Sequence, residues 1–378
     1  MGWYGTETLG DRAILLGLSQ VFEKAFGKCK IYLGSIYPFL SHRSYIEDKD
    51  FYKMIAPEID IEIFDVKEQA ELDGAIKKCV LVAMGGGPIM DLYDLGIIEY
   101  GFGFAKKNGK KTALLGCGVG PLFEAKFRKI TAHIFKLSDA IILRDNISKE
   151  SALQLLKEYK CDSIVNAKSI NVLCDPAIIP IESFRKCVTP KNATLAVNLR
   201  EFPVCYSKDG RTIDDEMFVG VLRCAAKVFD KVRLIPMHTF VIGGDDRHYL
   251  SKIRQRTEAG NVEVVHKPLS VYELFEEYYS AECCIGMRYH SVVFQTILNG
   301  KNGIFDYTEP NEGKISGFLT TLGIEDPYKT LYVNIQVSVP DAEGFISNIK
   351  KHKAIEFDEM IFENTSNGYS EALIGLMN

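Results

Sequence analysis

The sequence lacks several features that assign a class of protein directly. No apolar run approaches the roughly 18–20 residues of a membrane span, and no amino-terminal signal peptide is visible. Basic residues are scattered, and the formal net charge is −5. A chain that neutralises a long phosphate backbone needs many clustered cations, so nucleic acid is excluded as a partner. We therefore expect a cytoplasmic protein whose anionic ligands are small.

The cysteines also argue against a metal centre. The sequence has ten of them, single except for the Cys283-Cys284 pair, and none forms a Cys-x-x-Cys or Cys/His group with zinc spacing. Such cysteines are typical of small core residues in a reducing compartment. No metal and no cofactor are expected.

The chain has the length and pattern of a two-domain α/β protein. It has 378 residues, 47% hydrophobic and 25% charged, and short β-rich runs alternate with helical patterns. This alternation predicts parallel sheets. We expect an N-terminal Rossmann-like domain over residues 1–178, a C-terminal one over 190–340, and C-terminal helices over 341–378 that pack back on the first domain. The proline-bearing stretch 175–192 is predicted to be a linker.

The predicted elements follow this alternation along the chain. Strands are expected at residues 30–33, 61–64, 79–84, 112–116, 140–143, 163–166, 194–199, 231–236, 262–265, 283–286 and 303–305. Helices are expected at 11–26, 91–108, 124–137, 149–158, 215–229, 246–257, 271–279, 289–299 and 314–322.

The amino terminus departs from this pattern. Gly2-Trp3-Tyr4-Gly5 follows Met1 at once, with no apolar strand ahead of the glycines. Doubly wound domains place a strand there. Either the first strand is shortened or the sequence begins late.

Three glycine-bearing loops precede helices in the first half, over residues 2–11, 84–91 and 116–122. Glycines let the backbone approach a ligand, and helix starts supply unpaired N–H groups. The first loop is not a Gly-x-Gly-x-x-Gly fingerprint, so binding of NAD has little support. Each loop can also be a tight turn, and Asp11 can be a helix cap. Together the loops predict a sugar-acceptor site with Gly5, Asp11, Gly86, Gly87, Asp91 and Gly118.

Two further motifs of the first half are predicted to be structural. Arg144 and Asp145 form an ion pair that fixes a loop, with Ser148 or Asn146 as the cap of the next helix. The stretch 175–177, Asp-Pro-Ala, closes the first domain.

Cationic side chains follow strands in the second half. Arg200 directly follows one predicted strand, His238 lies two residues after another, and Arg288 and His290 stand at the start of a helix. Free N–H groups, the helix dipole and a guanidinium can converge there on one anion. Lys314 lies at the next helix start, where it can reach a phosphate or remain solvated. His238 can equally be a satisfied loop histidine.

Taken in order, these motifs resemble those of the polysaccharide pyruvyl transferase family. The resemblance runs from Gly5 to about Gly323. It rests on residues 5–11, 85–87 with 91, 116–121, 144–145 with 148, 175–177, 236–238 with 245–246, and 286–291. Two positions depart from the family pattern: Glu7 stands where asparagine is common, and Arg12 where an acidic residue is common.

The resemblance implies two Rossmann-like domains arranged as in GT-B glycosyltransferases. It also implies transfer of pyruvate from phosphoenolpyruvate to two hydroxyls of a sugar, as a ketal, in a cell-wall or extracellular polysaccharide or its precursor. The family's arginine-x-histidine element matches Arg288 and His290, and Arg200 is the counterpart of a further donor arginine.

These residues suggest a division of roles. Arg288, Arg200 and Lys314 are expected to neutralise the donor. His290 is the expected general acid/base, with His238 as second candidate, because imidazole titrates near neutral pH.

Two other functions stay open at this point. One is a GT-B glycosyltransferase with a nucleotide-sugar donor, and the other is a catalytically silent carbohydrate-binding homologue. A lipid-linked acceptor, peripheral contact with a membrane and a homo-oligomer are all compatible with the sequence.

Overall fold

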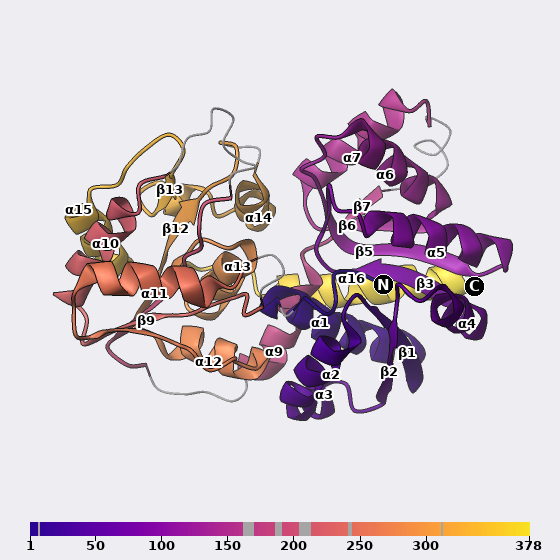
Figure 1. Ribbon diagram of the computed structural model, residues 1–378, viewed down its shortest axis with the longest axis horizontal. Coiled ribbons are helices and arrows are strands. Elements are labelled where there is room, and N and C mark those ends of the chain that lie inside the picture. The colour runs from indigo at the N-terminus through magenta and orange to yellow at the C-terminus, as the bar shows by residue number, and fades with distance from the viewer. Residues whose placement is uncertain (7, 162–169, 186–190, 204–212, 241–243, 311–312) are drawn as a thin grey trace. The chain divides into compact units, whose positions relative to one another are not determined.

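The computed structural model describes residues 1–378 except 7, 162–169, 186–190, 204–212, 241–243 and 311–312. The chain divides into two compact units. The first unit holds residues 1–7, 11–180 and 359–378, and the second holds residues 8–10 and 181–358. Each unit is an α/β body with parallel strands (Figure 1).

The strands of the first unit form two separate parallel sheets. One sheet has the order β3-β5-β6-β7, with β4 also paired to β5, and the other contains only β1 and β2. The bounds are β1 Cys29–Ser35, β2 Ile59–Asp65, β3 Leu81–Gly85, β4 Pro88–Ile89, β5 Lys111–Val119, β6 Ala140–Leu143 and β7 Ile170–Val172. β5 is the central strand of its sheet and is buried over most of its length, as expected for a strand covered on both faces.

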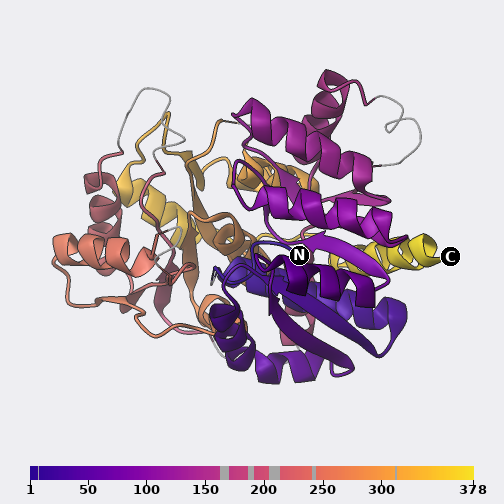
Figure 2. The same ribbon diagram turned by 45° about the vertical axis from the view of Figure 1, so that its right-hand side comes forward.

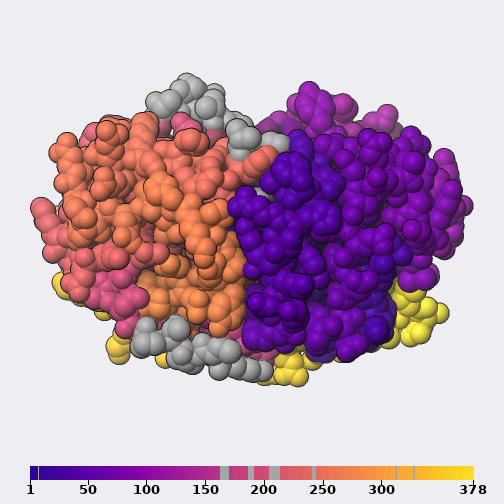
Figure 3. Space-filling model, turned by 60° about the horizontal axis from the view of Figure 1, so that its bottom comes forward, coloured from indigo at the N-terminus to yellow at the C-terminus, as the bar shows by residue number. Residues whose placement is uncertain are grey.

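Helices flank these sheets, and one of them is the last helix of the chain. They are α1 Leu9–Phe26, α2 Pro38–Glu47, α3 Lys49–Ile55, α4 Gln69–Lys78, α5 Leu95–Lys107, α6 Ala125–Leu137, α7 Asn146–Glu158, the 3₁₀ turn η1 Pro176–Ile178, and α16 Met360–Met377. The Tyr369 hydroxyl of α16 donates to the carbonyl of Cys174 at 3.1 Å. Figures 2 and 3 show α16, in yellow, beside the indigo and purple residues of the same unit.

The second unit contains one continuous parallel sheet with the order β10-β9-β8-β11-β12-β13. Its strands are β8 Thr194–Val197, β9 Lys231–Leu234, β10 Val262–Val264, β11 Cys283–Gly286, β12 Asn302–Asp306 and β13 Tyr332–Asn334. Counted from the first strand of the unit, this is the Rossmann order 3-2-1-4-5-6. The order reverses between β8 and β11, so a ligand site is expected at their carboxyl ends.

Seven helices and a 3₁₀ turn connect or flank these strands in the described part of the unit. They are α9 Ile179–Arg185, which enters from the first unit, α10 Glu216–Ala226, α11 Asp246–Thr257, α12 Val271–Ser280, α13 Tyr289–Leu298, α14 Lys314–Leu322, η3 Asp326–Tyr328 and α15 Ala342–Lys351. No helix in the described ranges combines the length and apolar character that a membrane span requires.

Two sequence-based expectations differ from the structure. The predicted linker 175–192 is wrong in its described part, which folds as η1 and α9. Pro176 begins η1, where its missing N–H removes no bond, and the Asp175 carboxylate accepts from the N–H of Ala177 at 3.0 Å. The expected segment 341–378 is divided, since α15 groups with the second unit and α16 with the first. Phe345 of α15 stacks on Phe305 of β12, which ties α15 to the second unit.

The element predictions otherwise fail mainly by omission. The helices α2, α3 and α4 and the short strands β4, β7 and β13 were not expected. The predicted strand 163–166 lies outside the described residues.

Of the cysteines, Cys117 and Cys174 are buried, and burial raises the pKa of each thiol to about 12.

Candidate functional site

The carboxyl ends of three strands of the second unit are joined through one buried side chain, Asn198, which directly follows β8. Its amide nitrogen donates to the carbonyl of Ile235 after β9, at 2.9 Å. Its amide oxygen accepts from the backbone N–H of Arg288 after β11, at 3.1 Å. Because Asn198 is fully buried, these two bonds fix where the chain leaves each strand. The arginine is therefore held in place at the switch point of the sheet.

The Arg288 side chain is oriented by a bidentate pair with Asp246, the first residue of α11. Arg288 Nε lies 2.8 Å from Asp246 Oδ2, and Nη2 lies 2.5 Å from Oδ1. The arginine side chain is 17% exposed and the aspartate 2%. Burial opposes the charge on Arg288, but the carboxylate outweighs it, so the pKa of the guanidinium is raised. A fork-to-carboxylate pair fixes the plane of the guanidinium as well as its position.

Asp246 is itself held by the loop that follows β9. Its Oδ2 accepts from the backbone N–H groups of Met237 and His238, at 3.0 and 3.1 Å. Its own N–H donates to the carbonyl of His238 at 2.9 Å. The backbone of His238 therefore positions Asp246, and its side chain is buried at 4% exposure.

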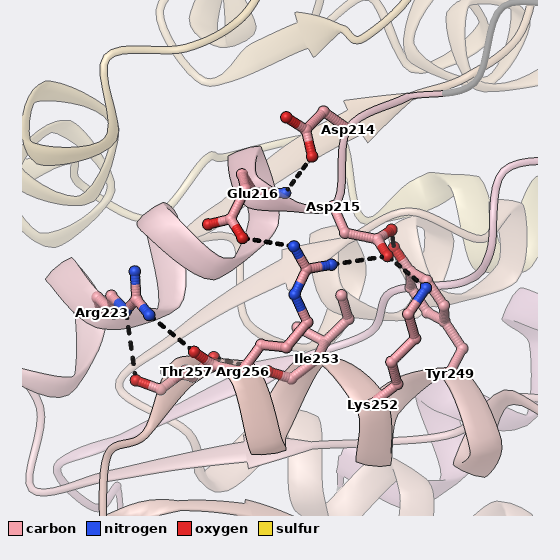
Figure 4. Close-up of polar contacts among 9 residues, drawn as sticks. All are labelled: Asp214, Asp215, Glu216, Arg223, Tyr249, Lys252, Ile253, Arg256 and Thr257. Carbon is pink, nitrogen blue, oxygen red and sulfur yellow. Dashed lines mark hydrogen bonds and ion pairs between the residues drawn. The ribbon is translucent and has the colours of Figure 1, made fainter.

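α11 is fixed at its other end by ion pairs with the start of α10 (Figure 4). Asp215 accepts from the Tyr249 hydroxyl at 2.8 Å, from Lys252 at 2.6 Å and from Arg256 at 3.1 Å. Arg256 also contacts Glu216. These contacts are partly solvent-exposed, so each contributes modestly. Together they hold the helix that carries Asp246.

Three cationic side chains converge on Tyr307, which follows β12 and is 1% exposed. The Arg200 guanidinium lies 5.4 Å from the Tyr307 ring centroid, and Lys314 Nζ lies 5.8 Å from it. Burial alone would raise the pKa of Tyr307. The positive charges of Lys314, Arg200 and Arg288 outweigh burial and lower that pKa to about 8. This end of the sheet therefore holds three cationic side chains around Tyr307, of which Arg288 is paired with Asp246, and we call it the positive site.

His290 lies next to this positive site, in the first turn of α13. Gly286 permits the close start of that helix, because a Cβ there would lie 2.7 Å from Gln295 Oε1 and 3.2 Å from Ser291 Oγ. The His290 ring packs edge-on against Tyr289 at 4.9 Å and is stacked on Phe294 at 5.9 Å. Lys314 Nζ lies 5.9 Å from the same Tyr289 ring. His290 is thus separated from the cations by one aromatic side chain.

Glycine backbone dominates the corresponding edge of the first unit. Gly5, Gly86 and Gly87 have φ of +91°, +103° and +70°. A Cβ on Gly87 would lie 2.3 Å from Trp3 Cδ1 and 3.3 Å from Asp11 Oδ1. Gly86 and Gly87 directly follow β3, and a Cβ on Gly5 would lie 2.5 Å from Ser35 Oγ at the end of β1. These predicted acceptor residues therefore lie near the carboxyl ends of parallel strands.

Gly118, the remaining predicted acceptor glycine, lies in β5 beside β4. It pairs with Pro88 in the β4–β5 ladder, and a Cβ there would lie 2.5 Å from Arg144 Nη2. The Arg144 guanidinium is buried between Asp145 and Asp175, at 3.5 Å from each. The predicted ion pair is thus present. The predicted cap is wrong, because Asp145 caps α7 by accepting from the N–H of Ser148 at 2.6 Å.

Asp11 and Asp91 were both expected at the start of a helix, and the structure places neither of them there. α1 begins at Leu9, so Asp11 lies within its first turn and is not the cap. α5 begins at Leu95, so the helix predicted from residue 91 starts late. Asp91 Oδ2 instead accepts from the N–H groups of Phe123 and Glu124, ahead of α6, at 2.8 and 3.0 Å. Asp91 therefore orients the loop after β5.

Sequence reasoning missed Asn198, Asp246 and Tyr307 as site residues. Asp246 stood in a recognised motif beside Asp245, and Asn198 directly preceded a strand-end arginine. Tyr307 carried no local signal, because its surroundings come from three separate elements. No group of three His, Cys, Asp or Glu side chains suited to a metal ion occurs among the residues described.

The family model described as polysaccharide pyruvyl transferase matches residues 9–307. Among solved structures, UDP-GlcNAc 2-epimerase from Methanocaldococcus jannaschii is similar at 12% identity and a TM-score of 0.58, over 96% of this chain and 97% of that one. S. aureus MnaA, solved with UDP, is similar at 14% identity and a TM-score of 0.55, over 100% of this chain and 95% of that one. At such identities the likeness concerns the fold alone. The expected fold class, two Rossmann-like domains of the GT-B kind, is confirmed.

Proposed function

We propose, from the premise that the chain belongs to the polysaccharide pyruvyl transferase family, that it transfers pyruvate from phosphoenolpyruvate to a sugar as a ketal. Membership supports a transferase of polysaccharide pyruvylation in general terms. The donor, the acceptor and the residue roles are our proposal.

One observation carries the choice of donor: the convergence of Arg200, Arg288 and Lys314 on the buried Tyr307 at the switch point. Phosphoenolpyruvate carries a carboxylate and a phosphate on the same carbon, C2, so it needs several cations within a small volume. Cations aimed at the transferring phosphate also stabilise the charge that develops as it leaves. Asp246 keeps the Arg288 fork at a fixed angle for this contact.

The reaction balances with residues of this chain acting only on protons. A sugar hydroxyl adds to C2 of phosphoenolpyruvate while a proton adds to the methylene carbon, which becomes a methyl group. The C2–O bond to phosphate then breaks, and a second hydroxyl of the same sugar closes the ring on C2. One hydroxyl proton accounts for the methyl group, and the other leaves with inorganic phosphate.

We assign the proton transfers to His290, with His238 as the second candidate. His290 lies in the first turn of α13 and contacts Tyr289, which borders Lys314. A placed imidazole typically accelerates such a step about 10²–10⁴-fold. His238 has the greater burial and a backbone already engaged with Asp246, which favours a positioning role for it.

The acceptor sugar is assigned to the glycine loops of the first unit. Gly5, Gly86, Gly87 and Gly118 expose backbone at strand ends, where N–H and C=O groups can bond hydroxyls. The acceptor is then a hexose of a cell-wall or extracellular polysaccharide, or of its lipid-linked precursor, met in the cytoplasm.

The test is release of inorganic phosphate from phosphoenolpyruvate with free and lipid-linked hexose acceptors, with the ketal product identified by mass spectrometry. Wild-type protein should release phosphate only when an acceptor is present, and His290→Ala should remain folded without turnover. Wild-type turnover in His290→Ala removes His290 from the mechanism. Thermal protection by UDP but not by phosphoenolpyruvate would instead favour a nucleotide-sugar donor.

A further inference from the structure

The three most exposed aromatic side chains in the described part of the chain lie at one edge of the first unit. Phe39, Tyr93 and Phe123 are 63%, 84% and 67% exposed, whereas no other described phenylalanine, tyrosine or tryptophan exceeds 39%. Each comes four residues after a parallel strand, because β1, β4 and β5 end at residues 35, 89 and 119. The exposed rings therefore share the carboxyl edge with the predicted acceptor glycines, and we call this edge the aromatic rim.

The loops of the aromatic rim are connected by hydrogen bonds. The Tyr4 carbonyl accepts from the N–H of Ile36, after β1, at 3.0 Å, and the Tyr4 hydroxyl donates to the carbonyl of Gly85, at the end of β3, at 2.5 Å. The Asp91 N–H donates to the carbonyl of Pro121 at 3.3 Å, which ties the loop after β4 to the loop after β5. The three rings therefore stand on one connected set of loops.

Two of the exposed rings are also held in position by neighbouring side chains. The Tyr93 ring packs edge-on against Phe127 of α6, with centroids 5.8 Å apart, and Lys126 Nζ lies 5.2 Å from the Tyr93 centroid. The Phe39 ring packs edge-on against Tyr37 at 6.5 Å. A ring that is already ordered loses little conformational entropy when a ligand stacks on it. Large exposed aromatic side chains gathered on one edge are typical of a binding surface.

The charge of the aromatic rim favours a neutral ligand. The segments 36–40, 90–94 and 120–124, which carry the rings, contain the carboxylates of Asp91, Asp94 and Glu124 and no lysine or arginine. An anionic bilayer or a phosphate-bearing ligand binds through lysine and arginine, so neither matches these segments. A sugar ring has an apolar C–H face that packs on an aromatic ring, and hydroxyls at its margin that donate to carboxylates. The rim therefore fits a neutral saccharide.

We propose that the acceptor is a neutral oligosaccharide, several sugar units long, and that Phe39, Tyr93 and Phe123 bind it by stacking against separate units. The reacting unit lies at the glycine loops, where Gly86 and Gly118 expose backbone, and its neighbours lie on the rings. This inference rests on the proposed function, which assigns the acceptor to the first unit, and adds the length and charge class of that acceptor.

The experiment is calorimetric titration of the full chain, without phosphoenolpyruvate, with neutral linear tetrasaccharides of glucose, mannose or galactose and with the matching monosaccharides. Wild type should bind at least one tetrasaccharide about tenfold or more tightly than its monosaccharide. The Tyr93→Ala, Phe123→Ala double variant should lose about tenfold in affinity for that tetrasaccharide, as expected for two lost stacking contacts. Tyr100→Ala removes the next most exposed ring, on α5, and should bind as wild type does. Both variants should keep the wild-type melting temperature, because the removed rings are largely exposed.

Equal affinity for monosaccharides and tetrasaccharides across the panel, or equal affinity of wild type and the double variant, overturns the inference. Sedimentation with phosphatidylcholine and phosphatidylglycerol vesicles tests the other occupant of such a surface. Vesicle binding that wild type shows and the double variant loses would assign the rings to a membrane and overturn the saccharide. Binding of the tetrasaccharide without any release of phosphate from phosphoenolpyruvate would contradict the proposed function and leave the saccharide site standing.

Discussion

The two units of the molecule both contain parallel sheets, but different kinds of residue follow the strands in each unit. In the second unit the sheet is continuous, and charged side chains gather where its order reverses: Arg200, Arg288 and Asp246. In the first unit the strands fall into two sheets, and the corresponding edge is lined by glycine backbone. The buried Arg144 near this edge is paired with Asp145 and Asp175. Under the proposed function, the second unit binds the anionic donor and the first unit binds the neutral hydroxyls of the acceptor.

The largest effect on this contrast between the two units is expected from removing the guanidinium of Arg288. Arg288→Ala should lower pyruvyl transfer about 10²–10³-fold, as expected for loss of one preorganised donor to the developing charge. Initial rates of phosphate release measure this. Arg256→Ala removes an equal charge from the far end of α11, where the side chain is 36% exposed, and should keep near-wild-type rates. Equal losses in the two variants would remove Arg288 from the donor site.

Because the cations lower the pKa of Tyr307, the free energy of unfolding should depend on pH in a way that reports on the positive site. A tyrosine whose pKa falls from 10 to about 8 on folding stabilises the protein above pH 10 and loses that contribution as the pH falls through 8. Wild type should therefore gain on the order of 2–3 kcal/mol over Tyr307→Phe between pH 8 and pH 10. Urea unfolding across this range measures the difference.

The same ionisation should weaken binding of an anion. Thermal protection of wild type by phosphoenolpyruvate should decline above pH 8, because a phenolate then competes for the cations, and Tyr307→Phe should lack this decline. Parallel pH profiles for the two proteins would contradict the cation cluster.

In the first unit, close approach of the backbone should matter more than charge. Gly87→Ala combines a left-handed backbone with a Cβ 2.3 Å from Trp3 Cδ1. Gly109→Ala has nearly the same φ, +67°, and no atom within 4 Å of the new Cβ. We expect about 1–2 kcal/mol of destabilisation at Gly109 from the backbone alone and about 1–3 kcal/mol more at Gly87. Chemical denaturation measures both losses of stability. Equal losses would show that the Trp3 side chain can move away from the new Cβ at no cost in free energy.

The smallest effect is expected in the exposed network of Figure 4. Asp215→Asn weakens ion pairs to Lys252 and Arg256, both on the surface of α11. We expect a loss of about 1 kcal/mol or less and unchanged donor affinity. A large loss of donor affinity would mean that α11 is positioned mainly from this end.

The sequence predicted best where one element carried its own pattern. The helices at 246–257 and 314–322 and the strands at 140–143 and 283–286 have the expected bounds. Asp245 caps the first helix, Gly323 ends the second, and the two strands are short apolar runs that end at Arg144 and at Gly286. The helices α2 and α3 were missed because their sequences mix charged and aromatic residues without a clear apolar face.

The residues of the candidate site also differ in whether local sequence is enough to find them. Strand ends and helix starts point to Arg200, Arg288, His290 and Lys314 from local sequence alone. Tyr307 could not be found that way, because its pKa depends on three cations from separate elements. Asp246 required knowing that the start of α11 lies against the end of β11, a contact that only tertiary structure provides.

The account depends on one small trianionic donor being bound by cations at the carboxyl end of the second sheet. Calorimetric titration of phosphoenolpyruvate into wild type and into the Arg200→Ala, Lys314→Ala double variant tests this directly. We predict saturable one-site binding to wild type, with affinity at least about tenfold weaker in the double variant as two charge contacts are lost. Equal affinity in the two proteins would contradict the account.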